Sequence, residues 1–83
     1  MTITGAQPTG LLEQVRAAQR LPTPAVARAI RQAAGVTQQR VADELAINRV
    51  TVARWELGER SPRGELRLRY VELLDTLREA SGG

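Results

Sequence analysis

Arginine carries most of the chemistry that this sequence offers. The 83 residues include 12 Arg and nine acidic residues, with no Lys, no His and no Cys, for a net charge of +3 at pH 7. A guanidinium group donates paired hydrogen bonds that match phosphate oxygens and guanine edges. A nucleic-acid partner is therefore one explanation of this composition, and a GC-rich genome that favours Arg codons is the other.

The position of the positive charge helps to separate these explanations. Residues 28–69 hold nine Arg and five acidic residues, a net charge of +4, and the rest of the chain carries a net charge of −1. The excess therefore lies in the middle of the chain and not in a charged tail. A folded basic surface, suited to a nucleic acid, is the interpretation that this distribution favours.

The sequence contains few residues suited to catalysis or to metal binding. Without His and Cys, we exclude thiol and imidazole nucleophiles, disulfides, Cys/His zinc sites and haem ligation. Asp43 and Glu44 are neighbours, but adjacent side chains point about 100° apart on a helix and share a site poorly. We therefore expect no enzyme activity, no metal and no cofactor. The chain also lacks an 18-residue apolar run and a signal peptide, so we expect no membrane partner and a cytoplasmic protein associated with the nucleoid.

The elements that must position these side chains are all predicted to be helices. Apolar spacing and capping residues predict helices over about 10–20, 24–34, 38–45, 49–57 and 64–79. The chain is expected to form a flexible arm over 1–8, a single domain over 9–79 and a frayed end over 80–83. The expected N-caps are Thr9, Thr23, Thr37 and Asn48, and the expected C-terminal glycines are Gly35 and Gly58.

The predicted core comes from apolar residues at helical spacing. We expect the helix over 10–20 to pack against 64–79, with a dimer interface as the alternative. Residues 66–70 also alternate like a strand, so a small β-wing over 60–70 is an alternative to helix there. The expected inward residues are Leu11, Leu12, Val15 and Ala18; Val26, Ile30, Ala33 and Ala34; Val41, Ala42 and Leu45; Val52 and Trp55; and Leu66, Tyr70, Leu73, Leu74 and Leu77.

Two short helices joined by a tight turn have the geometry of a helix-turn-helix, whose second helix lies in the major groove of DNA. The motif TQQRVADELAINRVTVARWELG, residues 37–58, resembles the Xre/Cro family of phage and bacterial repressors. The resemblance extends from about Val26 through Pro62, and more loosely to Leu77. It implies an all-α, lambda-repressor-like helix-turn-helix bundle of about five helices, here with an extra N-terminal helix.

The resemblance also implies roles for particular residues. The start of the helix over 49–57 would read bases, with Arg49 and Arg54 on guanine and Val50 on a thymine methyl group. Arg31 and Glu56 occupy the positions of a structural pair that ties two helices together. The alternative for the charged residues is a solvated surface. The implied base-reading residues are Asn48, Arg49, Val50, Thr51 and Arg54, and the implied phosphate contacts are Gln38, Arg60, Ser61 and Arg63.

Two departures from the family pattern carry physical consequences. Ala46 stands in the turn where the family usually has Gly, so a positive φ there would strain the backbone. Arg40 stands where a capping box would have Glu or Gln, three residues after Thr37. We expect Ala46→Gly to leave the stability unchanged or to raise it.

The sequence thus predicts a sequence-specific reader of double-stranded DNA, most simply a transcriptional repressor that covers its operator as a homodimer. An antitoxin or an accessory factor in site-specific recombination is the alternative within the same fold. A coactivator-like module that binds proteins is a third hypothesis, which the central Arg excess disfavours.

Overall fold

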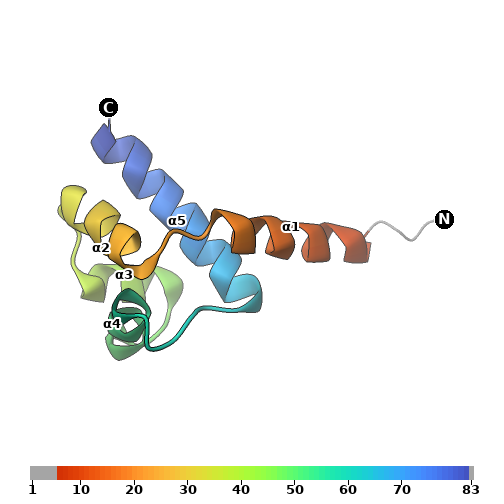
Figure 1. The fold of residues 1–83 in the computed structure, drawn as a ribbon, viewed down its shortest axis with the longest axis horizontal. Coiled ribbons are helices and arrows are strands. Elements are labelled where there is room, and N and C mark those ends of the chain that lie inside the picture. The colour runs from red at the N-terminus through yellow and green to blue at the C-terminus, as the bar shows by residue number, and fades with distance from the viewer. Residues whose placement is uncertain (1–5, 83) are drawn as a thin grey trace.

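The computed structural model describes residues 6–82, and every regular element in that range is helical. The elements are α1 (Ala6–Arg20), α2 (Pro24–Ala33), α3 (Gln38–Leu45), α4 (Arg49–Leu57) and α5 (Gly64–Gly82). Figure 1 shows α2, α3 and α4 grouped beside α5, while α1 crosses α5 and extends away from the group. The all-α prediction is confirmed, and the alternative β-wing over 60–70 is wrong because α5 begins at Gly64.

Side-chain caps explain where the inner helices begin. The hydroxyl of Thr23 accepts a hydrogen bond from the Val26 amide at 3.3 Å, and the hydroxyl of Thr37 accepts one from the Arg40 amide at 3.1 Å. The Asn48 side chain accepts from the Val50 amide at 2.7 Å. Each bond satisfies an amide that the first turn of a helix leaves without a partner, so the three predicted N-caps are confirmed.

The two ends of the chain are more helical than expected. α1 begins at Ala6, so the predicted start near residue 10 and the Thr9 cap are wrong, and residues 6–8 of the predicted arm are helical. Pro8 fits there because the first turn needs no hydrogen bond from its amides. The remaining residues of the predicted arm, 1–5, lie outside the described residues. α5 continues to Gly82, and only residue 83 of the predicted frayed end lies outside the description.

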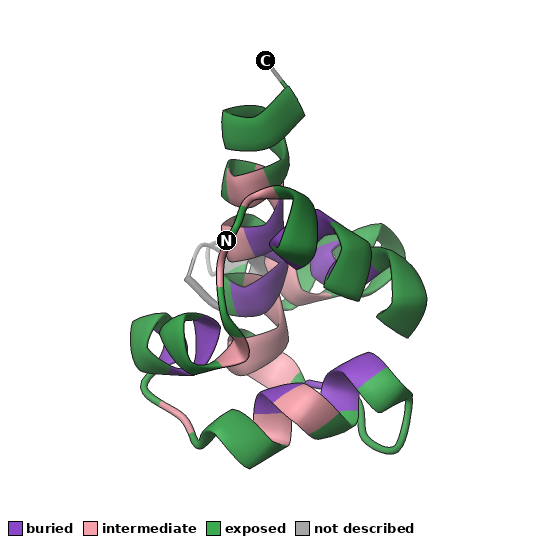
Figure 2. Cartoon of the chain, turned by 90° about the vertical axis from the view of Figure 1, so that its left-hand side faces the viewer, coloured by how far each residue is buried: buried purple, intermediate pink, exposed green. Residues whose placement is uncertain are grey.

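The core lies among α2, α3, α4 and α5. Figure 2 shows the buried segments turned inward and the exposed segments on the outside of the bundle. The Trp55 and Tyr70 rings pack with their centroids 4.7 Å apart and their planes tilted by 48°, an arrangement that adds to simple area burial. The buried core residues are Ala27, Ile30, Val41, Ala42, Leu45, Val52, Trp55, Tyr70 and Leu74.

Two of the predicted inward faces are wrong. α1 does pack on α5, but through the fully buried Ala17, and the predicted stripe of Leu11, Leu12, Val15 and Ala18 is exposed. A small alanine lets the two helices approach closely, so the larger side chains face away. α2 buries Ala27, Ile30 and Arg31, which leaves Val26 and Ala33 exposed. Its rotation follows from an inward Arg31, whose partner is described below.

The turn between α3 and α4 contains the strained residue that the sequence indicates. Ala46 has φ 57° and ψ 45°, and among the described residues it alone combines a positive φ with a side chain. A left-handed conformation costs an L-residue about 1 kcal/mol or more, and glycine avoids that cost. We therefore expect Ala46→Gly to raise the midpoint of thermal unfolding by several degrees.

The matched control is Ala29→Gly, in the exposed interior of α2, where glycine costs about 1 kcal/mol of helix stability. The same replacement should therefore act with opposite signs at the two sites, as measured by circular dichroism. A lower melting temperature for both variants would contradict the account of the turn.

Tyr70 is expected to make the stability fall at alkaline pH. Its hydroxyl is buried without a hydrogen-bond partner in the described part of the chain. Burial, assisted by the negative charge of Glu56 and opposed by Arg31, raises the pKa of Tyr70 to about 12. The unfolded chain loses this proton near pH 10, so the contribution to stability is complete below pH 10 and is lost as pH rises toward 12.

We expect the free energy of unfolding to fall by roughly 2 kcal/mol between pH 10 and pH 12 from this group. Tyr70→Phe keeps the ring and removes the unpaired hydroxyl, so it should leave stability at pH 7 unchanged or higher. Urea unfolding of both proteins across this pH range is the measurement. An equal alkaline loss in the two proteins would show that Tyr70 is not the responsible group.

Candidate nucleic-acid interface

α3, the turn and α4 form a rigid corner. The fully buried Ala42 lies on the inner face of α3, where a larger side chain would push α4 away. Val52 and Trp55 face inward from α4. Because these residues occupy the inner face, the start of α4 presents its other side to solvent.

The outward side of α4 carries the residues that the sequence places there. Arg49 and Arg54 are exposed, Val50 is 43% exposed, and Thr51 is half-buried. Asn48 is exposed too, but its side-chain oxygen is occupied by the Val50 amide, so its defined role is to cap the helix. A single exposed apolar residue such as Val50 is common on protein surfaces, so the two exposed guanidinium groups carry the chemistry of this face.

A chain of hydrogen bonds runs from the core to Arg49. The Gln38 amide nitrogen donates to the Glu56 carboxylate at 3.1 Å, and its oxygen accepts from Arg49 Nη1 at 3.1 Å. Gln38 is the first residue of α3 and Arg49 is the first residue of α4. The side chain of Gln38 thus connects the two helix starts and holds the Arg49 guanidinium in place.

The network ends in an ion pair within the bundle. Arg31 Nε and Nη2 donate to the two Glu56 carboxylate oxygens at 2.6 and 2.9 Å, and Nη1 donates to the Val36 carbonyl at 2.8 Å. The two side chains are only 10% and 3% exposed. The hydrogen bond to Glu56 raises the pKa of Arg31, although burial opposes that shift. The predicted pair therefore forms, and it fastens α2 to α4 and to the turn before α3.

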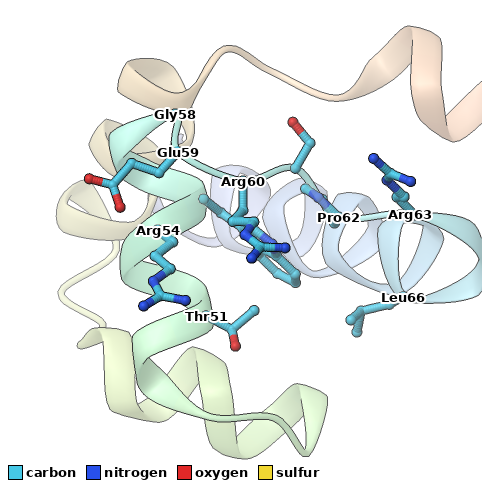
Figure 3. Close-up of a pocket in the computed structure, with 10 residues that line it drawn as sticks. Thr51, Arg54, Gly58, Glu59, Arg60, Pro62, Arg63 and Leu66 are labelled. Carbon is cyan, nitrogen blue, oxygen red and sulfur yellow. The ribbon is translucent and has the colours of Figure 1, made fainter.

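A second group of predicted residues lines an open groove beside α4. The groove, of about 840 Å³, runs along the exit loop, residues 58–63, to the start of α5. In Figure 3, Thr51 and Arg54 extend from α4, Arg60 from the exit loop, and Arg63 lies beside α5. The lining contains three arginines and one acidic residue, Glu59, and it reaches the amide groups at the start of α5. This combination of groups is suited to binding an anion.

The structure thus divides the predicted site residues into two groups. Gln38, Asn48, Arg49 and Val50 lie at the starts of α3 and α4, and Thr51, Arg54, Arg60, Ser61 and Arg63 line the groove. The sequence reasoning missed the contact between Gln38 and Arg49. The sequence feature that could have indicated this contact is a Gln and an Arg eleven residues apart, each at the first position of one helix of the motif.

Sequence reasoning also missed a contact of Arg69. Its Nη2 donates to the Glu44 carbonyl in the last turn of α3 at 3.3 Å. A cation near the last carbonyl groups of a helix is favourable, so this residue helps to hold α3 against α5. Among residues 6–82 no group of three acidic side chains could hold a metal ion, and none of the helices described is long and apolar enough to cross a membrane.

Comparison with known proteins places the chain in a family. A family model described as helix-turn-helix matches residues 28–79, from α2 to α5, and leaves α1 outside the match. No curated protein and no solved structure matches the chain. The matched segment is more than half of the sequence and contains the α3–turn–α4 corner with its arginines. The chain therefore belongs to the Xre and lambda Cro type of helix-turn-helix DNA-binding proteins.

Proposed function

We propose that this protein is a sequence-specific reader of double-stranded DNA that represses transcription by covering its operator. The observation that carries the proposal is the position of Arg49, exposed at the start of α4 and bonded to Gln38. A base-reading side chain gains specificity when its geometry is fixed before it meets DNA. The buried ion pair of Arg31 and Glu56 supplies that fixed point through Gln38.

In this proposal α4 enters the major groove. Arg49 and Arg54 donate paired hydrogen bonds to guanine O6 and N7, and Val50 packs on a thymine methyl group. Asn48 and Thr51 lie beside them at the base edges. A thymine methyl group is the apolar partner that the major groove offers to the exposed Val50.

The groove beside α4 would follow the sugar-phosphate backbone. Arg60, Ser61 and Arg63 line it with Arg54, and Gln38 contacts a phosphate at the start of α3. Such contacts supply affinity and orientation but read no sequence. They also make binding sensitive to salt, since each neutralised phosphate releases counterions.

Repression would follow from occupancy of the operator. A single helix-turn-helix makes few base contacts, and its specific affinity at physiological salt is low. Two copies on half-sites about 34 Å apart, one turn of the DNA helix, would cover a promoter and exclude polymerase. We therefore propose a homodimer on DNA.

Selection from a randomised duplex pool at physiological salt tests this function. We expect enrichment of an inverted repeat with half-sites about 10 base pairs apart and guanines in each half. A single or directly repeated site would instead favour an accessory role in recombination. Binding without enrichment, which only weakens as salt rises, would contradict sequence reading and favour a protein-binding module.

A further inference from the structure

α1 presents an apolar face that no part of the described chain covers. Leu11, Leu12 and Val15 are 67%, 48% and 45% exposed, and the exposed Ala18 continues the same side of the helix. The opposite side is fastened to α5 by the buried Ala17 and by an ion pair between Arg20 and Asp75. The exposed face is therefore held in its outward orientation and does not result from a loose helix.

The exposed apolar residues of α1 lie close together, whereas the other exposed apolar residues of the described chain are scattered. Six large apolar side chains are exposed in the described chain, and three of them fall within five residues of α1. The others are single residues on α2 and α4, including Val50 at the proposed DNA surface. A cluster of this kind marks an interaction site, whereas scattered single residues need no explanation.

The charge of the face indicates which partner it suits. Leu11, Leu12, Val15 and Ala18 form a surface without a charged side chain, so it has no attraction for phosphates. A two-fold contact places each surface against its own copy, and a charged surface would then repel itself. An uncharged apolar face is compatible with its own copy. Since α1 also lies outside the matched helix-turn-helix segment, this face is a feature added to the shared fold.

We infer that the α1 face, Leu11, Leu12, Val15 and Ala18, binds the same face of a second copy of this chain. The inference rests on the proposed function, which calls for two copies on one operator. Val15 lies near the middle of the face, so a two-fold axis brings the two Val15 side chains together. The contact is between the added helices, and none of its four residues lines the groove beside α4.

The area of the face sets the strength of this contact. A stable interface buries about 800 Å² on each partner, well above what three aliphatic side chains supply. We therefore expect free dimers with a dissociation constant of ~10 µM to ~1 mM. On an operator, the two copies are held at an effective concentration in the millimolar range, so a weak contact is sufficient.

Sedimentation equilibrium of the full chain, without DNA, tests the interface directly. We expect the wild-type chain to form reversible dimers at protein concentrations up to ~1 mM. Val15→Glu should raise the dissociation constant of the dimer at least ~30-fold, because the dimer would then bury two facing carboxylates. The control is Val26→Glu, at a valine of the same 45% exposure on α2, which should leave association unchanged. A wild-type chain that stays monomeric, or dimers that Val15→Glu leaves intact, would overturn the inference.

A second measurement uses the absence of cysteine from the sequence. The single thiol of Val15→Cys should form a disulfide-linked dimer under mild oxidation, far faster than the thiol of Val26→Cys. Equal rates would count against the α1 contact. Neither readout needs DNA, so failure of the interface is distinguishable from failure of DNA reading.

A randomised duplex pool connects the two proposals. The wild-type chain should enrich an inverted repeat, and Val15→Glu should enrich one half-site only. Enrichment by neither protein would refute the proposed DNA reading, while sedimentation would still decide whether α1 pairs. An inverted repeat selected equally well by Val15→Glu would place the dimer contact elsewhere and overturn the inference.

Discussion

Replacing Glu56 with alanine is expected to lower the free energy of unfolding by about 3–5 kcal/mol. The Glu56 carboxylate accepts two hydrogen bonds from Arg31 and one from Gln38. Its removal leaves the Arg31 guanidinium in the interior with only the Val36 carbonyl as a partner. For a domain of this size, such a loss consumes a large part of the total stability.

Two further variants separate the cost of an unpaired charge from loss of packing. The double variant Arg31→Met with Glu56→Leu removes both charges and should recover most of the stability. Glu44→Ala removes the exposed partner of Arg40 and should change stability by less than about 1 kcal/mol. Urea unfolding is the measurement. A double variant as unstable as Glu56→Ala would show that the ion pair itself, and not the unpaired charge, is the stabilising element.

Replacing Arg54 with alanine is expected to weaken binding to the selected operator by about 1–3 kcal/mol and to relax one base position. Arg49→Ala should have an effect of the same size at a different position, because the two residues lie five positions, about 1.4 turns, apart on α4. Binding to unrelated duplex DNA should change little. Fluorescence anisotropy on operator and scrambled duplexes measures both effects.

The controls for this prediction are arginines in other positions. Arg63→Ala should weaken operator and scrambled DNA alike and reduce the salt slope by about one, because Arg63 is proposed to contact phosphate. Arg78→Ala, near the end of α5, removes the same charge and should change neither. Gln38→Ala should affect the same base position as Arg49→Ala, since Gln38 bonds to that guanidinium, and it should also weaken binding to scrambled DNA, since Gln38 is proposed to contact a phosphate. Uniform losses from all these variants would refute base reading by α4.

The helix-turn-helix was predictable because local rules agree along that segment. Thr37 and Asn48 are good caps with apolar residues at helical spacing behind them, and each rule requires only near neighbours in sequence. At Ala46 the glycine usual in the family left a positive φ as a condition for strain, and the structure has a positive φ there. When the local conformational preferences of the residues agree with the fold, the structure of the segment can be predicted from its sequence.

The orientation of the outer helices was not predictable in the same way. An apolar stripe on α1 indicates which side of the helix is apolar, but the partner helix decides which side is buried. On α1 the side that packs against α5 carries the small Ala17. α2 is rotated from its apolar pattern because Arg31 must reach Glu56, 25 residues away. The contact of Gln38 with Arg49 likewise depends on how two helices cross. Periodicity carries no information on these long-range choices.

The central claim is that arginines of α4 read guanines from the major groove. The most direct test is a double-mutant cycle between Arg54→Ala and 7-deazaguanine, which lacks the N7 acceptor, at each guanine of the selected operator. We predict one guanine at which the base change costs the wild-type protein ~10-fold or more in affinity and costs Arg54→Ala almost nothing. Equal losses for both proteins at every guanine, or a selected operator without guanine, would contradict the claim.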